Sequence, residues 1–150
     1  MRKVGKVYAY ITHEERLLVF KHVNFPEAGI QVPGGTLDAG ERPEDAVLRE
    51  ACEETGLRGL VMNKYLGSDE FLDKSTKPNK YLVRHFFHLI CPYEASENWQ
   101  HYEHYPSDGS PGPILFEFCW LPLAEASGKL DRYFVTMLDR LPDPLTGDQV

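Results

Sequence analysis

One segment constrains the fold of this chain more than any other. It is a cluster of helix-breaking residues followed by a predicted helix that has a start signal at one end and a stop signal at the other. Residues 33–35, Pro-Gly-Gly, stop any preceding strand and predict a loop that runs to Gly40. Pro43 follows at a position where its missing N–H costs a helix nothing, and Gly56 suits a left-handed helix end. The sequence therefore predicts a helix from Pro43 to Gly56, presented by a glycine-rich loop.

This predicted helix has two chemically different faces. At about 100° per residue, its apolar arc consists of Val47, Leu48, Ala51 and Cys52. A separate acidic arc consists of Glu50, Glu53 and Glu54, which are spaced i, i+3, i+4. We expect the apolar face to pack on a sheet and the acidic face to present its three carboxylates together. A divalent cation would remove their mutual repulsion, and Mg²⁺ and Mn²⁺ prefer carboxylate ligands. Solvent-exposed acidic helix faces are nevertheless common, so the three glutamates alone do not distinguish a metal site from an ordinary acidic surface.

The rest of the chain predicts strands and one further helix. Strands are expected at 4–10, 16–21, 29–32, 60–66, 68–72, 81–91 and 114–121. The stretch 92–113 contains four prolines and is expected to be irregular. Apolar residues at helical spacing predict a second helix over 131–141, and the tail after Pro142 is expected to fray. The sum is one domain, 1–150, of the α/β or α+β class, with a mixed β-sheet flanked by helices.

Composition excludes several classes of protein. The 16 Lys+Arg against 23 Asp+Glu give a net charge of -7, which argues against long nucleic acid or an anionic membrane as partner. No apolar stretch approaches the roughly 20 residues of a membrane helix, and the first residues lack the pattern of a signal peptide.

The three cysteines, Cys52, Cys91 and Cys119, have no C-x-x-C spacing. We expect mostly buried thiols in a reducing cytoplasm.

The segment Gly35 to Leu57 fits the pattern G-x5-E-x7-R-E-U-x-E-E-x-G-U, in which U is aliphatic. Its nine fixed positions are Gly35, Glu41, Arg49, Glu50, Ala51, Glu53, Glu54, Gly56 and Leu57. Chance would produce this match on the order of once per billion starting positions. The segment strongly resembles the signature of the Nudix hydrolase family, and a looser resemblance covers the preceding VPGG and residues 118–126. Ala51 departs from the bulkier aliphatic residue usual there, which concerns packing more than chemistry.

The resemblance implies a fold and a reaction. Family members are α/β/α sandwiches that use Mg²⁺, or Mn²⁺, to hydrolyse a nucleoside diphosphate linked to another group X. Metal ions neutralise the charged diphosphate and activate water, and a carboxylate takes the proton. By resemblance, Glu50 and Glu54 are direct metal ligands, Glu53 is a ligand or holds water in the metal's shell, and the Gly34 carbonyl is a further ligand. Arg49 completes the implied catalytic set by pairing with Glu41 or Glu53 and orienting them.

The general base and the substrate contacts are less constrained. Either Glu50 or a residue outside the motif could be the base; the outside candidates are His101, Glu103, His104, Asp108 and Glu117. Strand alternation places Arg84, Phe86 and His88 on one face of 81–91, where they could line a cleft, and the other face carries Val83, His85, Phe87 and Leu89. Tyr102, in an aromatic-rich stretch, could stack on a base, cover the core or form a dimer contact. Glu117 is a further candidate substrate contact.

Two other functions fit the same fold. A non-catalytic sensor that binds nucleotides tends to lose the motif glutamates, and all are present here. A prenyl diphosphate isomerase needs a catalytic cysteine, whereas Cys91 and Cys119 lie in predicted strands. The expected partner is a small nucleoside diphosphate derivative. Nucleoside triphosphates, nucleotide sugars, dinucleoside polyphosphates and capped RNA ends all remain open, as does a homodimer, because dimers are frequent among relatives.

Overall fold

The computed structural model of the protein describes residues 2–104 and 112–142. In chain order, the elements are β1 (Arg2–His13), β2 (Arg16–His22), η1 (Pro26–Ala28), β3 (Gly34–Thr36), α1 (Pro43–Thr55), β4 (Val61–Asp73), β5 (Lys80–Ile90), β6 (Asn98–Glu103), β7 (Ile114–Pro122), α2 (Leu123–Lys129), η2 (Arg132–Phe134) and η3 (Leu138–Arg140). Within these residues, seven strands form one sheet in the order β4-β5-β1-β2-β7-β6, and β3 pairs with β1. The β1–β5 pair is parallel and the other pairs are antiparallel.

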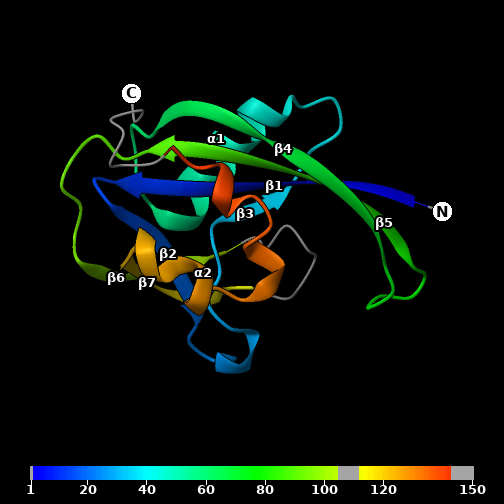
Figure 1. Ribbon diagram of the computed structural model, residues 1–150. Helices are drawn as coiled ribbons and strands as arrows, with labels where there is room; N and C mark the ends of the chain where they lie inside the picture. The colour runs from blue at the N-terminus through cyan, green and yellow to red at the C-terminus, as the bar shows by residue number, and fades with distance from the viewer. Residues whose placement is uncertain (1, 105–111, 143–150) are drawn as a thin grey trace.

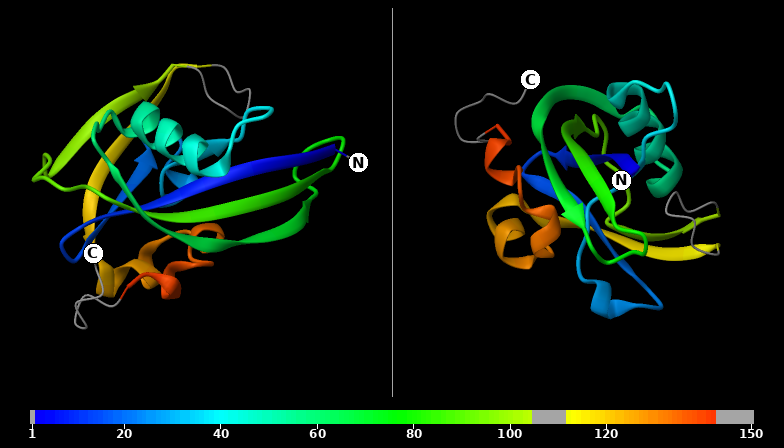
Figure 2. Two further views of the ribbon diagram at one scale, coloured as in Figure 1. Left: turned by 90° about the horizontal axis from the view of Figure 1, so that it is seen from above. Right: turned by 90° about the vertical axis from the view of Figure 1, so that its right-hand side faces the viewer.

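Helices cover both faces of this sheet. Helix α1 lies on one side, and α2 with the 3₁₀ turns η2 and η3 lies on the other (Figures 1 and 2). Each face has its own hydrophobic core: Phe87 and Phe118 belong to the core under α1, and Phe86 and Phe134 to the opposite one. Neighbouring residues such as Phe86 and Phe87 divide between the cores because side chains alternate along a strand. The predicted α/β/α sandwich with a mixed sheet is confirmed.

The sheet divides at its centre. Strands β1 and β2 pair only beside their connecting turn, at Thr12↔Leu17 and His13↔Arg16. Beyond that point β1 pairs with β3, while β2 pairs with β7 and makes a single bridge from Phe20 to Gln31. The segment that leads into β3 therefore lies between two diverging strands, which leaves room for a cleft there.

The expected strand at 29–32 is wrong. Ile30 and Gln31 make only isolated bridges, and the strand begins later, at Gly34. Glycine explains the shift, because a Cβ at Gly34 would lie 2.4 Å from both the Tyr8 ring and the Val7 carbonyl oxygen. The breaker cluster that predicted a loop is thus what allows this close backbone approach to β1.

The expected second helix at 131–141 is also wrong. The segment forms η2 and η3, and the helix lies earlier, at Leu123–Lys129. Side chains from the sheet bind its backbone: Arg84 donates to the Tyr133 carbonyl at 2.6 Å and the Tyr10 hydroxyl to the Phe134 carbonyl at 2.7 Å. Carbonyls bound in this way are satisfied without a regular helix, although Leu130 and Phe134 are buried as their spacing suggested.

Three smaller expectations change as well. Part of the stretch expected to be irregular is β6, which pairs with β7 from Asn98↔Cys119 to Glu103↔Ile114. The two segments expected at 60–66 and 68–72 are one strand, β4, with register shifts near Met62 and Tyr65. Of the three thiols only Cys91 is buried, and Cys52 and Cys119 are exposed.

Among residues 2–104 and 112–142, every helix is too short or too polar to span a lipid bilayer. The expected frayed tail falls at residues 143–150, outside the described part of the chain.

Candidate functional site

Helix α1 forms where the sequence predicts it. It runs from Pro43 to Thr55 and ends at Gly56, whose φ of 79° is left-handed and whose N–H donates to the Cys52 carbonyl at 2.9 Å. Ala46, Val47 and Ala51 are fully buried against the sheet. The apolar arc is therefore narrower than expected, because Cys52 lies outside the packed face.

The acidic face of α1 is only partly exposed to solvent. Glu50 and Glu54 are only 3% and 5% exposed, whereas the side chain of Glu53 is 58% exposed. The loop before the helix covers the two buried carboxylates. Gly34 N–H donates to Glu54 Oε1 at 3.1 Å, and a Cβ at Gly35 would lie 2.2 Å from Glu50 Cδ. Glycine at position 35 is thus required by the contact with Glu50 rather than only by a turn.

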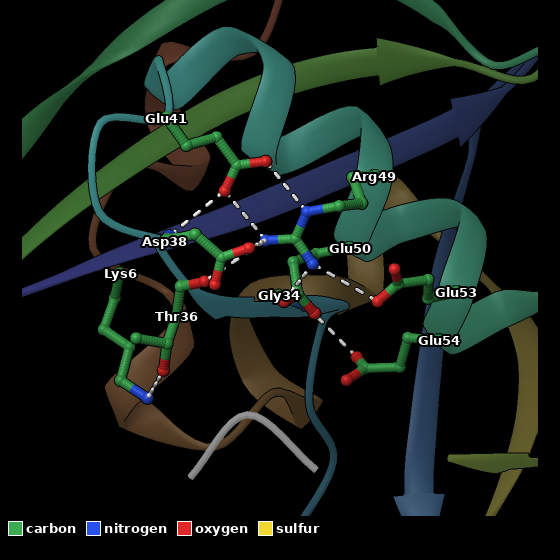
Figure 3. Close-up of polar contacts among 9 residues, drawn as sticks. All are labelled: Lys6, Gly34, Thr36, Asp38, Glu41, Arg49, Glu50, Glu53 and Glu54. Carbon is green, nitrogen blue, oxygen red and sulfur yellow. Dashed lines mark hydrogen bonds and ion pairs between the residues drawn. The ribbon is translucent and has the colours of Figure 1, made fainter. Parts of the chain in front are cut away.

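Arg49 binds the carboxylates on either side of it (Figure 3). Its Nε and Nη2 donate to the two oxygens of Glu41 at 2.8 and 2.9 Å, a bidentate pair. Its Nη1 donates to Glu50 Oε1 at 3.0 Å and to Glu53 Oε2 at 3.3 Å. Nη2 also lies 3.4 Å from Asp38 Oδ2. Arg49 therefore pairs with both Glu41 and Glu53, and it holds Glu50 as well.

These contacts and the burial of the side chains give the carboxyl groups different pKa values. The hydrogen bonds from Arg49 lower the pKa of Glu41 to about 2. Burial raises the pKa of Glu50 to about 7, against the opposing attraction of Arg49. Burial also raises the pKa of Glu54 well above its ordinary value, and the neighbouring carboxylate of Glu103 adds to that increase. The site therefore contains carboxyl groups that are costly to ionise without a nearby cation.

Glu103 reaches this site from the edge strand β6. Trp99, on the same strand, donates from Nε1 to the Thr55 carbonyl at 2.9 Å and so ties β6 to the end of α1. Glu103 lines two hollows. The first, about 790 Å³, is lined by Glu53, Gln100, His101, Tyr102, Glu103 and His104. The second is the cleft, about 330 Å³, which opens where β1 and β2 diverge.

The cleft runs from charged to aromatic residues. Its lining residues are Lys6, Tyr8, Phe20, His22, Ala28, Gln31, Val32, Gly34, Gly35, Glu54, Glu103, Ile114, Phe116 and Phe134. Glu54, Glu103 and the two glycines form its acidic end, beside Glu50. The side chains contributed by β2, β7 and η2 are mostly apolar. The cleft thus joins the carboxylates of α1 to an apolar compartment.

The residues at the acidic end fit a divalent cation. Glu50 Oε2 is buried and has no hydrogen-bond partner in residues 2–104 and 112–142. A buried carboxylate oxygen without a donor is costly, and a cation would satisfy it. Burial favours the protonated forms of Glu50 and Glu54, and a hard cation with oxygen preference would displace those protons.

Comparison with known proteins decides the family. The family model of the NUDIX domain matches residues 2–141. The chain belongs to the Nudix hydrolase family. The loop and helix just described contain the segment that resembles the family signature, and the chain is an enzyme of the class that acts on phosphoric anhydride bonds.

Similar solved structures agree with the Nudix fold. A MutT NUDIX hydrolase from Burkholderia pseudomallei is 19% identical, with a TM-score of 0.63, and the match covers 95% of this chain and 100% of that one. The dihydroneopterin triphosphate pyrophosphohydrolase of E. coli is 18% identical, with a TM-score of 0.59 and 87% of each chain covered. The NUDIX domain of Shewanella oneidensis NrtR, complexed with ADP ribose, is 16% identical, with a TM-score of 0.58 and coverage of 93% and 85%.

The structure brings most residues of the Nudix motif together, but not all the predicted substrate contacts. Arg84, Phe86 and His88 share the predicted strand face, yet none of them lines the cleft. Arg84 is bound to Asp69 at 2.6 Å, and His88 is hydrogen-bonded to Thr12 Oγ1 at 2.7 Å. All three are buried in or beside the core on the side of α2, so we leave them out of the proposed site.

The remaining candidates fall in three places. Glu103 lies in the cleft, whereas His101, His104 and Tyr102 line the larger hollow beside Glu53. Glu117 lies in neither; it is 3.8 Å from Lys21 and its side chain is 43% exposed. Asp108 lies outside the described residues.

Sequence reasoning missed the apolar part of the Nudix cleft. Phe20, His22 and Gln31 line it, and they come from β2 and the segment before β3. No local pattern marks them, because they meet only when the two strands diverge.

Proposed function

We propose that this chain hydrolyses the diphosphate linkage of a nucleoside diphosphate joined to another group X, with Mg²⁺ as its cofactor and Mn²⁺ as a substitute. One observation carries the proposal: buried Glu54 lines a cleft that is acidic at one end and apolar at the other, and the buried carboxylate of Glu50 lies next to Gly35 of the same lining. A diphosphate fits the charged end when a cation is present, and a nucleoside fits the apolar end.

The residues that would hold the cation come from one helix and the loop before it. Glu50, Glu53 and Glu54 would supply carboxylate oxygens, and the Gly34 carbonyl would supply a backbone oxygen. A bound Mg²⁺ supplies charge neutralisation of the diphosphate and a more acidic water. Arg49 keeps Glu50 and Glu53 in place through Nη1, and Glu41 keeps Arg49 in place through its two hydrogen bonds.

Glu103 is our candidate for the general base. A base must reach the attacking water from beside the metal ligands, and Glu103 lines the cleft next to Glu54. Glu50 is less suited, because Arg49 already holds its Oε1 and Gly35 packs against its carboxyl group. In this scheme, the water oxygen bonds to one phosphorus of the diphosphate while its proton passes to the Glu103 carboxylate, and the bridging P–O bond breaks to release the other phosphate with its substituent.

Similar proteins support the substrate class. One is a dihydroneopterin triphosphate pyrophosphohydrolase, and another was crystallised with ADP ribose. Both compounds carry a planar ring system and a phosphoric anhydride.

We also propose that residues 1–150 form a single Nudix domain, because the family match covers 2–141 and both cores share one sheet. Cytoplasmic location and a homodimer stay predictions.

The test is release of phosphate or nucleotide from a panel of nucleoside triphosphates, nucleotide sugars and dinucleoside polyphosphates. We expect turnover with Mg²⁺ or Mn²⁺, its loss with EDTA, and a fall of at least about 100-fold in kcat for Glu54→Gln, more than the 10–100-fold typical of groups that only support a ligand. No turnover across the panel, or unchanged turnover in the variant, would falsify the proposal. Tight nucleotide binding without turnover would instead indicate a sensor.

A further inference from the structure

The apolar end of the cleft contains two polar side chains, His22 and Gln31, that use only part of their hydrogen-bonding capacity in the described residues. His22 lies at the end of β2, and Gln31 lies opposite Phe20 in the segment before β3. Both line the cleft together with Phe20 and Phe116. Neither has a role in the metal site described above, so their function has to be sought at the far end of the cleft.

His22 is held by aromatic contacts rather than by hydrogen bonds. Its ring meets Phe116 edge-on at a centroid distance of 5.2 Å and Phe25 at 5.4 Å. Its Nδ1 is buried and has no hydrogen-bond partner in the described residues. An orphaned buried nitrogen costs roughly 1–3 kcal/mol, so a ligand that bonds it recovers that cost. Because no hydrogen bond from residues 2–104 and 112–142 holds Nδ1, this atom can serve as a donor or as an acceptor, depending on the tautomer.

Gln31 is similarly available. In the described part of the chain, its side chain makes one hydrogen bond, from Nε2 to the Ala28 carbonyl at a long 3.4 Å. Its backbone is firmly placed, because N–H and C=O exchange two 2.9 Å bonds with Phe20. The amide can therefore offer a donor and an acceptor side by side from a fixed position.

The walls between these groups are aromatic. The Phe20 and Phe116 rings lie 4.4 Å apart, and Phe134 and Tyr8 face the cleft from the other core. Such walls suit a planar ring rather than a sugar, whose hydroxyl groups need donors and acceptors on all sides. A nucleobase offers a flat face for the rings and alternating donors and acceptors along its edge.

We propose that His22 and Gln31 are specificity-determining residues that bind the edge of a heteroaromatic base, which lies against Phe20 and Phe116. The inference rests on the proposed function, since it names the part of the substrate that occupies the apolar end of the same cleft. It favours substrates in which a base is joined to the scissile phosphates, such as nucleoside triphosphates.

The first test compares substrates that differ only in the base. The four common nucleoside triphosphates and ribose 5-triphosphate are assayed with Mg²⁺. We expect kcat/KM for the best nucleotide to exceed that for ribose 5-triphosphate by about 10- to 100-fold, the range that base stacking supplies. Equal values would overturn the inference while leaving the proposed hydrolysis intact.

The second test removes the polar atoms and keeps the shape. In His22→Phe and Gln31→Met, the ratio of kcat/KM between nucleotide and ribose 5-triphosphate should fall about tenfold each, the loss typical of one hydrogen bond. His85→Phe is the matched control, because His85 bonds Tyr65 at 3.1 Å away from the cleft. A fall that is equal for both substrates would show a merely structural role and overturn the inference.

A binding measurement separates the two proposals. Calorimetry with nucleoside monophosphates and ribose 5-phosphate needs no turnover. Tighter binding of a monophosphate than of ribose 5-phosphate, lost in His22→Phe, would support the inference even if no compound in the panel is hydrolysed. Equal binding of the two, or no binding of either, would overturn it.

Discussion

At the scale of single residues, Arg49 organises the charges of the site. Its guanidinium bonds three glutamates and so uses nearly all its donors. Lysine would keep the charge but could not reproduce the bidentate pair with Glu41. We expect Arg49→Lys to lower kcat by about 10- to 100-fold, as for other groups that orient metal ligands. Steady-state kinetics with a Mg²⁺ titration checks this, and wild-type activity at saturating Mg²⁺ would contradict it.

Glu103 and Glu117 lie on the neighbouring strands β6 and β7, so the kinetic effects of replacing each glutamate by glutamine can be compared directly. Glu103 lines the cleft, whereas Glu117 pairs with Lys21 outside it. If Glu103 is the base, Glu103→Gln should lower kcat by about 100-fold or more, within the 10²–10⁴-fold range of general base catalysis. Glu117→Gln serves as the control with near wild-type kinetics. A wild-type kcat in Glu103→Gln would exclude the role.

His88 is a buried base that links stability to pH. Asn63 Nδ2 lies 2.9 Å from its Nδ1, and burial lowers its pKa to about 4 from 6.5. Because the folded-state pKa is lowered, the unfolded chain binds the proton first as the pH falls below about 6.5. The contribution of His88 to stability is complete above that pH and is lost down to about pH 4, by up to about 3 kcal/mol.

Urea unfolding at pH 7, 6 and 5 measures this loss. His88→Gln, which does not titrate, should lose less stability between pH 7 and pH 5 than the wild type. An equal change in both proteins would show that His88 is not the group responsible.

At the scale of elements, two glycines with left-handed backbone conformations, Gly56 and Gly59, allow backbone strain to be compared with side-chain contact. Gly56 and Gly59 have φ of 79° and 75°, so alanine is strained at both. At Gly59 nothing lies within 4 Å of an added Cβ, whereas at Gly56 it would lie 2.9 Å from the His101 ring. We expect Gly59→Ala to cost about 1 kcal/mol and Gly56→Ala about 1–3 kcal/mol more.

Denaturant unfolding measures the difference between these two variants. Because the His101 ring sits on β6, which also carries Glu103, Gly56→Ala should lower activity as well as stability. Gly59→Ala should lower stability alone. Equal losses in the two variants would mean that β6 does not rest against the end of α1.

At the scale of the whole molecule, Arg84 joins the C-terminal segment to the sheet. Its Nε and Nη2 pair with Asp69 at 2.9 and 2.6 Å, and its Nη1 and Nη2 bond Tyr133 and Thr136 of the 3₁₀ region. The guanidinium also lies 4.3 Å from the centroid of the Tyr133 ring. One side chain thus connects β4, β5 and the segment that covers the second core.

Breaking this connection should be costly. Arg84→Met leaves Asp69 and two backbone or hydroxyl groups without their partner, and we expect a loss of about 3 kcal/mol in the free energy of unfolding. Lys129→Met removes an exposed ion pair with Glu125 and should cost at most about 0.5 kcal/mol. Thermal and urea unfolding of both variants checks the contrast. A small effect at Arg84 would refute the tethering role.

Much of α1 and its loop could be predicted from the sequence. The helix begins at Pro43 and ends before Gly56, as local rules require, and Arg49 contacts the glutamates that lie one turn away or in the adjoining loop. These features depend on residues close in the chain, so periodicity and turn chemistry suffice to predict them.

Burial, by contrast, was decided by the tertiary structure. The helical wheel grouped Glu50, Glu53 and Glu54 correctly, but only the fold shows that Gly34 and Gly35 cover two of them and leave the third exposed. A pattern along one helix does not contain the partner that packs against it. The same reason explains why Arg84, at a plausible position on its strand, lies in a buried ion pair instead of the cleft.

The sequence by itself determined the fold class, the family and the carboxylates of α1, because these follow from local periodicity and a motif of nearby residues. Only the tertiary structure decided where the cleft lies and which side chains line it. Phe20, His22, Gln31 and Glu103 meet because β1 and β2 diverge and β6 is anchored to α1 by Trp99. Contacts between residues so far apart in the chain depend on the packing of the whole sheet, which no local pattern records.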